Sequence, residues 1–185
     1  MARASLLTIL LLGTACATVT RHPLTEDDEL RKRVAQSARD LLGPRQLTLD
    51  GHDLPADCLS LPRAAYGRNG FDLSAQTPAA LYQKVRREGH WFTQGTPRSG
   101  DLVFTRDSDR ARSLHVGLVG GVESDGTVVV LQRMARGVTA YRMNPRHPHD
   151  EHAPGDLRSW NDTVASNGEG APAGALFSGY ASLLP

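Results

Sequence analysis

The spacing of apolar residues changes near Gly95, and this change limits the fold more than any other feature of the sequence. Before it, apolar residues recur at helical spacing; after it, short Val- and Leu-rich segments alternate with turn residues. The expected strands are 101–105, 115–119, 127–132 and 138–143, with a last one within 176–184. Helices followed by an antiparallel sheet make an α+β arrangement, which we predict for this chain.

Helix-start signals support three helices in the first half. Thr25, followed by Asp28, is typical of a capping pair. Asp57 is expected to cap the second helix, and Thr77, followed by proline, the third. The expected helices cover about 26–42, 58–68 and 78–88.

The first residues are typical of an export signal. A short apolar run follows Arg3 and is too short to span a bilayer. Small residues then precede Cys16, as in a bacterial lipobox. We therefore predict a signal peptide (1–16) with lipidation at Cys16, a tether (17–25) and one domain (26–185), which makes a periplasmic lipoprotein of the bacterial cell envelope. Plain secretion and an uncleaved N-terminal helix remain alternatives.

Charge and composition exclude some partners. The net charge of +1, from 21 Lys and Arg against 20 Asp and Glu, gives no reason to expect a nucleic-acid partner. Membrane contact is expected only through the lipid anchor, and the domain is expected to be a monomer. His147, His149 and His152 lie in a proline-rich segment that we interpret as a solvated loop, so we expect no metal or cofactor.

Cys58 is the single thiol that the predicted domain retains, because the other cysteine, Cys16, lies in the leader. A lone thiol in an oxidising compartment needs a reason. A helix start beside Cys58 would favour the thiolate and offer N–H groups to an oxyanion. The alternative is an inert, buried cysteine that packs as a small apolar residue.

His115 opens an apolar strand, where a polar imidazole must find a partner or meet water. Gly117 shares its face by alternation and is expected to leave open space beside the ring. A base that approaches both a thiol and a substrate would use that space. The alternative is a hydrogen-bonded histidine at a strand end.

Gln132 is the third candidate, because a hairpin would bring its strand beside His115. Its side-chain carbonyl would accept the imidazole N–H and fix the tautomer. The alternative is an ordinary exposed glutamine at a strand end.

Three ordered segments resemble NlpC-type and CHAP-type cell-wall cysteine peptidases. Asp57-Cys58 resembles the helix start of that family, 97–104 resembles its Pro-x-x-Gly-Asp-Leu-Val-Phe strand, and His115-Val116-Gly117 resembles its His-Val-Gly strand. The resemblance covers about residues 28–143. It implies a papain-like fold in which Cys58 is the nucleophile, His115 the base and Gln132 the residue that orients the histidine. It also implies hydrolysis of peptide or amide bonds in peptidoglycan without a metal.

The cysteine segment departs from the family in its details. Leu59 and Ser60 stand where the family has Ser and Gly, and Pro62 removes a backbone donor early in the helix. These departures leave a second interpretation open, in which the chain is a catalytically weak or inactive envelope binding module on the same fold.

Overall fold

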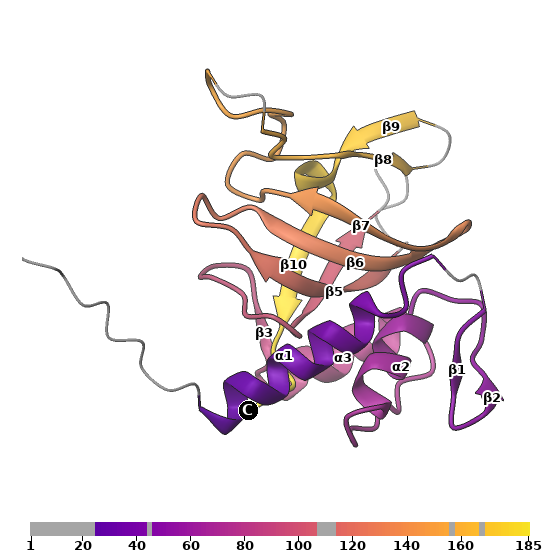
Figure 1. The fold of residues 1–185 in the computed structure, drawn as a ribbon. Coiled ribbons are helices and arrows are strands. Elements are labelled where there is room, and N and C mark those ends of the chain that lie inside the picture. The colour runs from indigo at the N-terminus through magenta and orange to yellow at the C-terminus, as the bar shows by residue number, and fades with distance from the viewer. Residues whose placement is uncertain (1–24, 44–45, 107–113, 156–157, 167–168) are drawn as a thin grey trace, which may run out of the picture.

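The structure is a computed structural model that describes residues 25–43, 46–106, 114–155, 158–166 and 169–185. Helices occupy the first part of the chain and strands the second, as the spacing of apolar residues predicts (Figure 1). The predicted α+β class is confirmed. The described elements are α1 (Glu26–Arg39), β1 (Thr48–Leu49), β2 (His52–Asp53), α2 (Ser60–Gly67), α3 (Pro78–Arg87), β3 (Trp91–Phe92), β4 (Leu102–Arg106), β5 (Leu114–Val122), β6 (Val128–Met134), β7 (Gly137–Met143), β8 (Thr163–Ser166), β9 (Glu169–Pro172), the 3₁₀ turn η1 (Ala173–Leu176) and β10 (Phe177–Ala181).

One antiparallel sheet organises the domain. Its six strands run in the order β3-β10-β4-β5-β6-β7, and every pair within it is antiparallel. The last strand, β10, therefore lies between β3 and β4, which brings the end of the chain back beside the middle. The short hairpins β1-β2 and β8-β9 stand outside this sheet.

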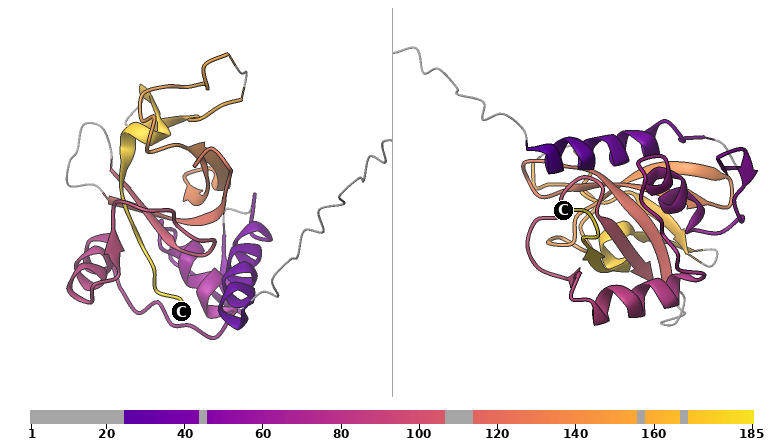
Figure 2. Two further views of the ribbon diagram at one scale, coloured as in Figure 1. Left: turned by 90° about the vertical axis from the view of Figure 1, so that its left-hand side faces the viewer. Right: turned by 90° about the horizontal axis from the view of Figure 1, so that it is seen from below.

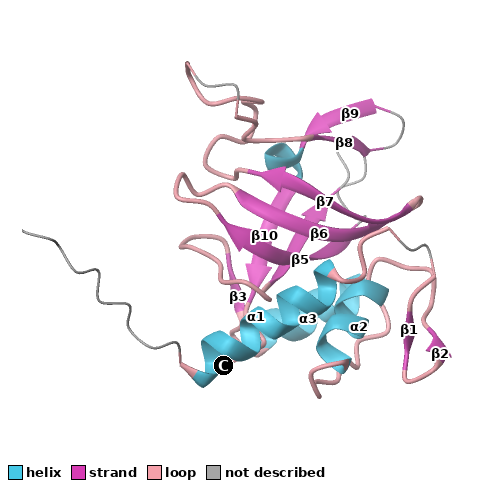
Figure 3. Ribbon diagram, viewed as in Figure 1, coloured by secondary structure: helices cyan, strands magenta, loops and turns pink. Residues whose placement is uncertain are grey.

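The helices cover one face of the sheet and the β8-β9 hairpin lies beyond the other (Figures 1 and 3). Seen from below, α1 and α3 lie toward opposite edges of this one face (Figure 2). Alternation along the strands divides the core accordingly: Phe104, Val116 and Leu118 pack toward the helices, whereas Val103, Val119 and Tyr141 belong to a second cluster.

Local signals account for the helix ends. The hydroxyl of Thr25 accepts the N–H of Asp28, whose carboxylate accepts in return, so the predicted capping pair of α1 is confirmed. The Thr77 hydroxyl accepts the N–H of Ala80 at the start of α3. The first helix ends at Arg39, three residues earlier than predicted, and the buried Leu41 packs into the core from the turn that follows.

A buried ion pair joins the helical layer to the sheet and to the end of the chain. Arg31 on α1 is 2% exposed, and its Nη1 lies 2.6 Å from a carboxylate oxygen of Asp101. The same guanidinium donates to the carbonyl oxygens of Leu184 and Pro185. Because each of the three guanidinium nitrogens donates a hydrogen bond, the charge is held without contact with bulk water.

Candidate active site

Cys58 lies in the turn that leads into α2. The helix begins at Ser60, two residues later than predicted. Asp57 therefore does not act as the predicted helix cap; its Oδ1 accepts the N–H of Leu59 at 2.9 Å and its backbone oxygen accepts the Ser60 hydroxyl at 2.8 Å. Both bonds close the turn around Cys58 and hold the backbone of the sulfur-bearing residue.

Pro62 does not weaken this helix start. It occupies the third position of α2, where a backbone N–H has no partner within the helix. The first intrahelical bond is made by the next residue, whose N–H donates to the carbonyl of Leu59 at 2.9 Å. The missing N–H of Pro62 therefore costs the helix no internal hydrogen bond, because Cys58, whose carbonyl it could have reached, precedes the helix.

Arg63 fixes the same turn from the helix side. Its Nη1 lies 3.2 Å from Oδ2 of Asp57, and its Nη2 donates to the carbonyl of Ala75 at 2.7 Å. The guanidinium thus connects the cysteine turn to the segment before α3. It also places a positive charge near the sulfur.

Burial raises the pKa of the Cys58 thiol above its ordinary value. The backbone N–H of Val116 acts in the opposite direction, the Asp57 carboxylate raises the pKa further, and the N–H of Cys58 itself and Arg63 lower it. Burial outweighs the favourable groups, so the expectation of a thiolate favoured by the helix start is wrong for the isolated chain.

His115 lies on β5, directly before the residue whose N–H faces the Cys58 sulfur. It pairs with Thr105 of β4 across the sheet. Cys58 and His115 line one open cleft of about 970 Å³, which runs from the cysteine turn past the start of β5 to the β6-β7 turn and β8. The structure therefore brings the predicted nucleophile and the predicted base to the same cavity.

The space expected beside His115 at Gly117 is filled. A Cβ there would lie 2.9 Å from the carbonyl oxygen of Leu131 and 3.0 Å from Cγ1 of Val130. The expectation of open room is wrong, because side chains and backbone of the flanking strands close over the glycine. Gly117 instead allows close packing in the middle of the sheet.

Gln132 shares a sheet face with His115 by alternation, and both line a smaller pocket of about 60 Å³. The glutamine is 4% exposed, so the alternative of an exposed strand-end residue is excluded. Its Oε1 accepts the hydroxyl of Tyr141 at 2.6 Å, and the side chain of Thr105 is hydrogen-bonded to that same hydroxyl. Three buried polar groups from β4, β6 and β7 thus meet beside the histidine strand.

Sequence reasoning missed a second wall of the cleft. The β6-β7 hairpin contributes Arg133, Arg136 and Thr139 to it, and β8 contributes Thr163 and Val164. Two arginines give this wall positive charge, which suits a substrate with carboxylates. Their spacing in the sequence is that of any polar hairpin, and β8 lies in a segment interpreted as loop, so no local signal pointed to them.

Several expectations concern other parts of the chain. The signal peptide, Cys16 and residues 17–24 of the tether lie outside the described residues. Among the residues that the structure describes, no helix has the length and apolar character needed to cross a membrane. The same residues contain no group of three or more His, Cys, Asp or Glu side chains placed to hold a metal. The ring of His147 stacks on Trp160 with centroids 3.8 Å apart, so it is packed rather than fully solvated.

Comparisons of the chain with models of known protein families, with curated proteins and with solved structures found no match.

Proposed function

We propose that this protein is a thiol hydrolase with a papain-like arrangement, in which Cys58 attacks a peptide or amide carbonyl. The observation that carries the proposal is that Cys58 and His115 line one cleft and that the N–H of Val116, next to His115, faces the sulfur. A cysteine beside a histidine that can act as its general base is a recurrent way to activate a thiol. The cleft is large enough for an extended peptide.

The raised pKa of Cys58 determines how the reaction would begin. Because burial favours the protonated thiol, His115 would remove its proton as the sulfur attacks the carbonyl carbon. The Cys58 N–H would donate to the developing oxyanion. The C–N bond then breaks as the imidazolium returns the proton to the leaving amine. Water, deprotonated by His115, hydrolyses the thioester and restores the thiol.

Gln132 would act as a positioning residue. Its Oε1 is fixed by Tyr141, and a carbonyl oxygen has a second lone pair with which to accept an imidazole N–H. A neutral amide adds no negative charge beside an imidazolium, unlike a carboxylate. The role of Gln132 would therefore be to orient the histidine and fix its tautomer.

Peptidoglycan stem peptide is the substrate we propose. Its free carboxylates suit the two arginines that line the cleft, Arg133 and Arg136. The proposed export leader, with Cys16 as lipid anchor, would place the enzyme in the bacterial envelope beside this substrate. The resemblance of the cysteine and histidine segments to cell-wall peptidases supports the same choice.

Release of muropeptides from purified sacculi tests the proposal. Cys58→Ala and His115→Ala are expected to reduce release by at least about 10³-fold, as removal of a nucleophile or base does elsewhere. His90→Ala is the matched control, because His90 is exposed and lies on the short connection after α3. Equal release by the wild-type protein and Cys58→Ala would overturn the proposal.

A binding module is the second candidate, and the raised pKa of the partly buried Cys58 thiol favours it. Such a module would sediment together with sacculi without releasing fragments from them. Retention by both the wild-type protein and Cys58→Ala, with no release by either, would favour this candidate over the hydrolase.

A further inference from the structure

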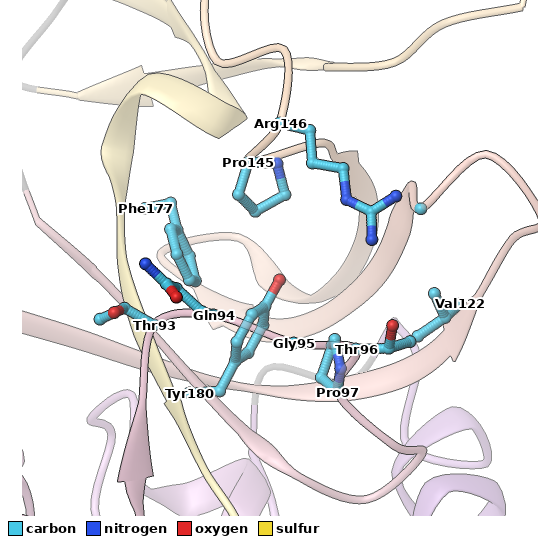
Figure 4. A pocket seen from close by; sticks show the side chains of 11 residues that line it. Thr93, Gln94, Gly95, Thr96, Pro97, Val122, Pro145, Arg146, Phe177 and Tyr180 are labelled. Carbon is cyan, nitrogen blue, oxygen red and sulfur yellow. The ribbon is translucent and has the colours of Figure 1, made fainter.

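A second pocket of about 290 Å³ lies away from the Cys58 cleft and shares no lining residue with it (Figure 4). The segment between β3 and β4, the loop after β7 and strand β10 form its walls. Polar side chains come from Thr93, Gln94 and Thr96, and apolar ones from Pro97, Pro145 and Phe177. Its volume is near the lower end for small-molecule sites, which is enough for one sugar or amino acid.

Tyr180 is a buried residue whose hydroxyl is aimed into this pocket. The residue is 3% exposed, and Figure 4 shows its hydroxyl pointing into the space between Phe177 and Arg146. Within the described part of the chain this hydroxyl makes no hydrogen bond. A phenolic hydroxyl can both donate and accept a hydrogen bond, so one that faces a cavity can serve a polar ligand there.

Arg146 faces the same space with its positive charge. Its charge lowers the pKa of Tyr180, although burial raises that pKa more strongly. Among the described residues its guanidinium pairs with no carboxylate. The two acidic side chains between the lining residues Val122 and Gly126 are engaged elsewhere: Glu123 pairs with Arg142, and Asp125 accepts from the indole N–H of Trp160. The pocket therefore keeps a net positive charge.

The backbone that carries Arg146 is fixed by buried amides. Its N–H donates to Oδ1 of Asn144 at 3.0 Å, and Asn144 is held by Asn161 and Thr127. Gly126 lies under the side chain, since a Cβ there would come 3.2 Å from Nη1 of Arg146. The Arg146 guanidinium is thus held by a hydrogen-bonded loop above Gly126, which has no side chain. Such preorganisation lowers the cost of binding an anion.

We propose that this pocket binds an acidic sugar. The anionic group would sit between the Arg146 guanidinium and the Tyr180 hydroxyl, as a charge-assisted pair. The C–H faces of the ring would contact Phe177 and the prolines, and its hydroxyl or amide groups would meet the Thr93, Gln94 and Thr96 side chains. The proposal does not depend on Cys58 chemistry and would hold for a hydrolase or for a binding module.

Titration followed by NMR tests the proposal with two sugars that differ in charge. N-acetylmuramic acid carries a carboxylate on its ring, and N-acetylglucosamine is the neutral counterpart. The full chain is expected to bind the acidic sugar at least about tenfold more tightly. Arg146→Gln should remove this preference, and Tyr180→Phe should weaken acidic-sugar binding by about three- to tenfold, the usual range for one hydrogen bond. D-lactate and inorganic phosphate serve as anions without a sugar ring.

Control variants separate binding from folding and from catalysis. Arg68→Gln removes an exposed arginine at the end of α2, and Tyr82→Phe removes a hydroxyl on α3; both should bind like the wild-type protein. Cys58→Ala should also bind the acidic sugar normally, so failure of the hydrolase proposal can be distinguished from failure of the sugar-binding proposal. Thermal unfolding checks that Tyr180→Phe is folded. Equal binding of the two sugars, tighter binding of phosphate or lactate than of the acidic sugar, or unchanged binding by folded Arg146→Gln would each overturn the proposal.

Discussion

The hydroxyl of Tyr141 donates a 2.6 Å hydrogen bond to Oε1 of Gln132, and both side chains are buried beside the strand that carries His115. Burial of an amide and a phenol is tolerated only when their polar atoms are paired. The bond therefore holds the Gln132 side chain in one orientation, with its carbonyl available to a neighbouring donor.

Tyr141→Phe is expected to leave the Gln132 carbonyl without its donor while keeping the ring in the core. The loss should lower the free energy of unfolding by about 1–3 kcal/mol. If Gln132 orients His115, kcat should fall about tenfold with little change in KM, which corresponds to about 1.4 kcal/mol. Urea unfolding and steady-state kinetics measure the two effects. Tyr82→Phe, which loses an exposed bond from Arg86, should change neither.

Alkylation of Cys58 by iodoacetamide should show a pKa above that of an exposed thiol. Burial disfavours the thiolate, so the rate should be low at pH 7 and rise as the pH passes beyond the ordinary thiol range. The same shift predicts that the contribution of the neutral thiol to stability is present at neutral pH and is lost as the pH rises through the raised pKa. Mass spectrometry of the Cys58 peptide across a pH series checks this. A rate already maximal at pH 6 would contradict it.

Two substitutions near the sulfur should move its pKa in opposite directions. Asp57→Asn removes a negative charge that raises the pKa but keeps an Oδ1 acceptor for the Leu59 N–H, so the pKa should fall. Arg63→Gln removes a positive charge that lowers the pKa, so it should rise. The alkylation profile measures both. Shifts in the same direction would show that the variants act through altered burial rather than through charge.

Gly117→Ala should destabilise the domain, because the added Cβ meets the Leu131 carbonyl oxygen at 2.9 Å and that oxygen belongs to the sheet backbone. Overpacking of this kind costs about 1–3 kcal/mol. Gly121→Ala is the matched control on the same strand, where the nearest atom would be Nη2 of Arg39 at 3.7 Å. Denaturant unfolding compares the two. A loss at Gly121 as large as that at Gly117 would exclude local crowding as the cause.

The fold was predictable where local signals and periodicity agreed. The helix caps at Thr25 and Thr77 and the Val-rich strands needed no distant information, and the structure confirms them. The short strand β3 was missed, as were β8 and β9, because two to four residues cannot establish a period of two. The position of β10 between β3 and β4 depends on contacts between distant segments, which no local pattern contains.

The candidate site was predictable only as a set of residue types. Cys58 and His115 stood out because of their positions at element starts, and the structure places them in one cleft. The sign of the thiol pKa shift was not predictable, because it depends on how deeply the sheet buries the sulfur. Tyr141 was missed because an aromatic residue in a strand usually signals packing, and only the β6-β7 register brings its hydroxyl to Gln132.

The buried pair Arg31–Asp101 should be the most sensitive point of the fold outside the site. Arg31→Met leaves the Asp101 carboxylate, about 2% exposed, without its counter-charge, and Asp101→Asn does the converse. Either change should lower the free energy of unfolding by about 3–5 kcal/mol. The double variant Arg31→Met/Asp101→Asn should be less destabilised than the sum of the single variants, because no isolated charge remains buried. Chemical unfolding of the four proteins gives the coupling. Additive losses would show that each residue acts through separate contacts, such as those of Arg31 with the Leu184 and Pro185 carbonyls.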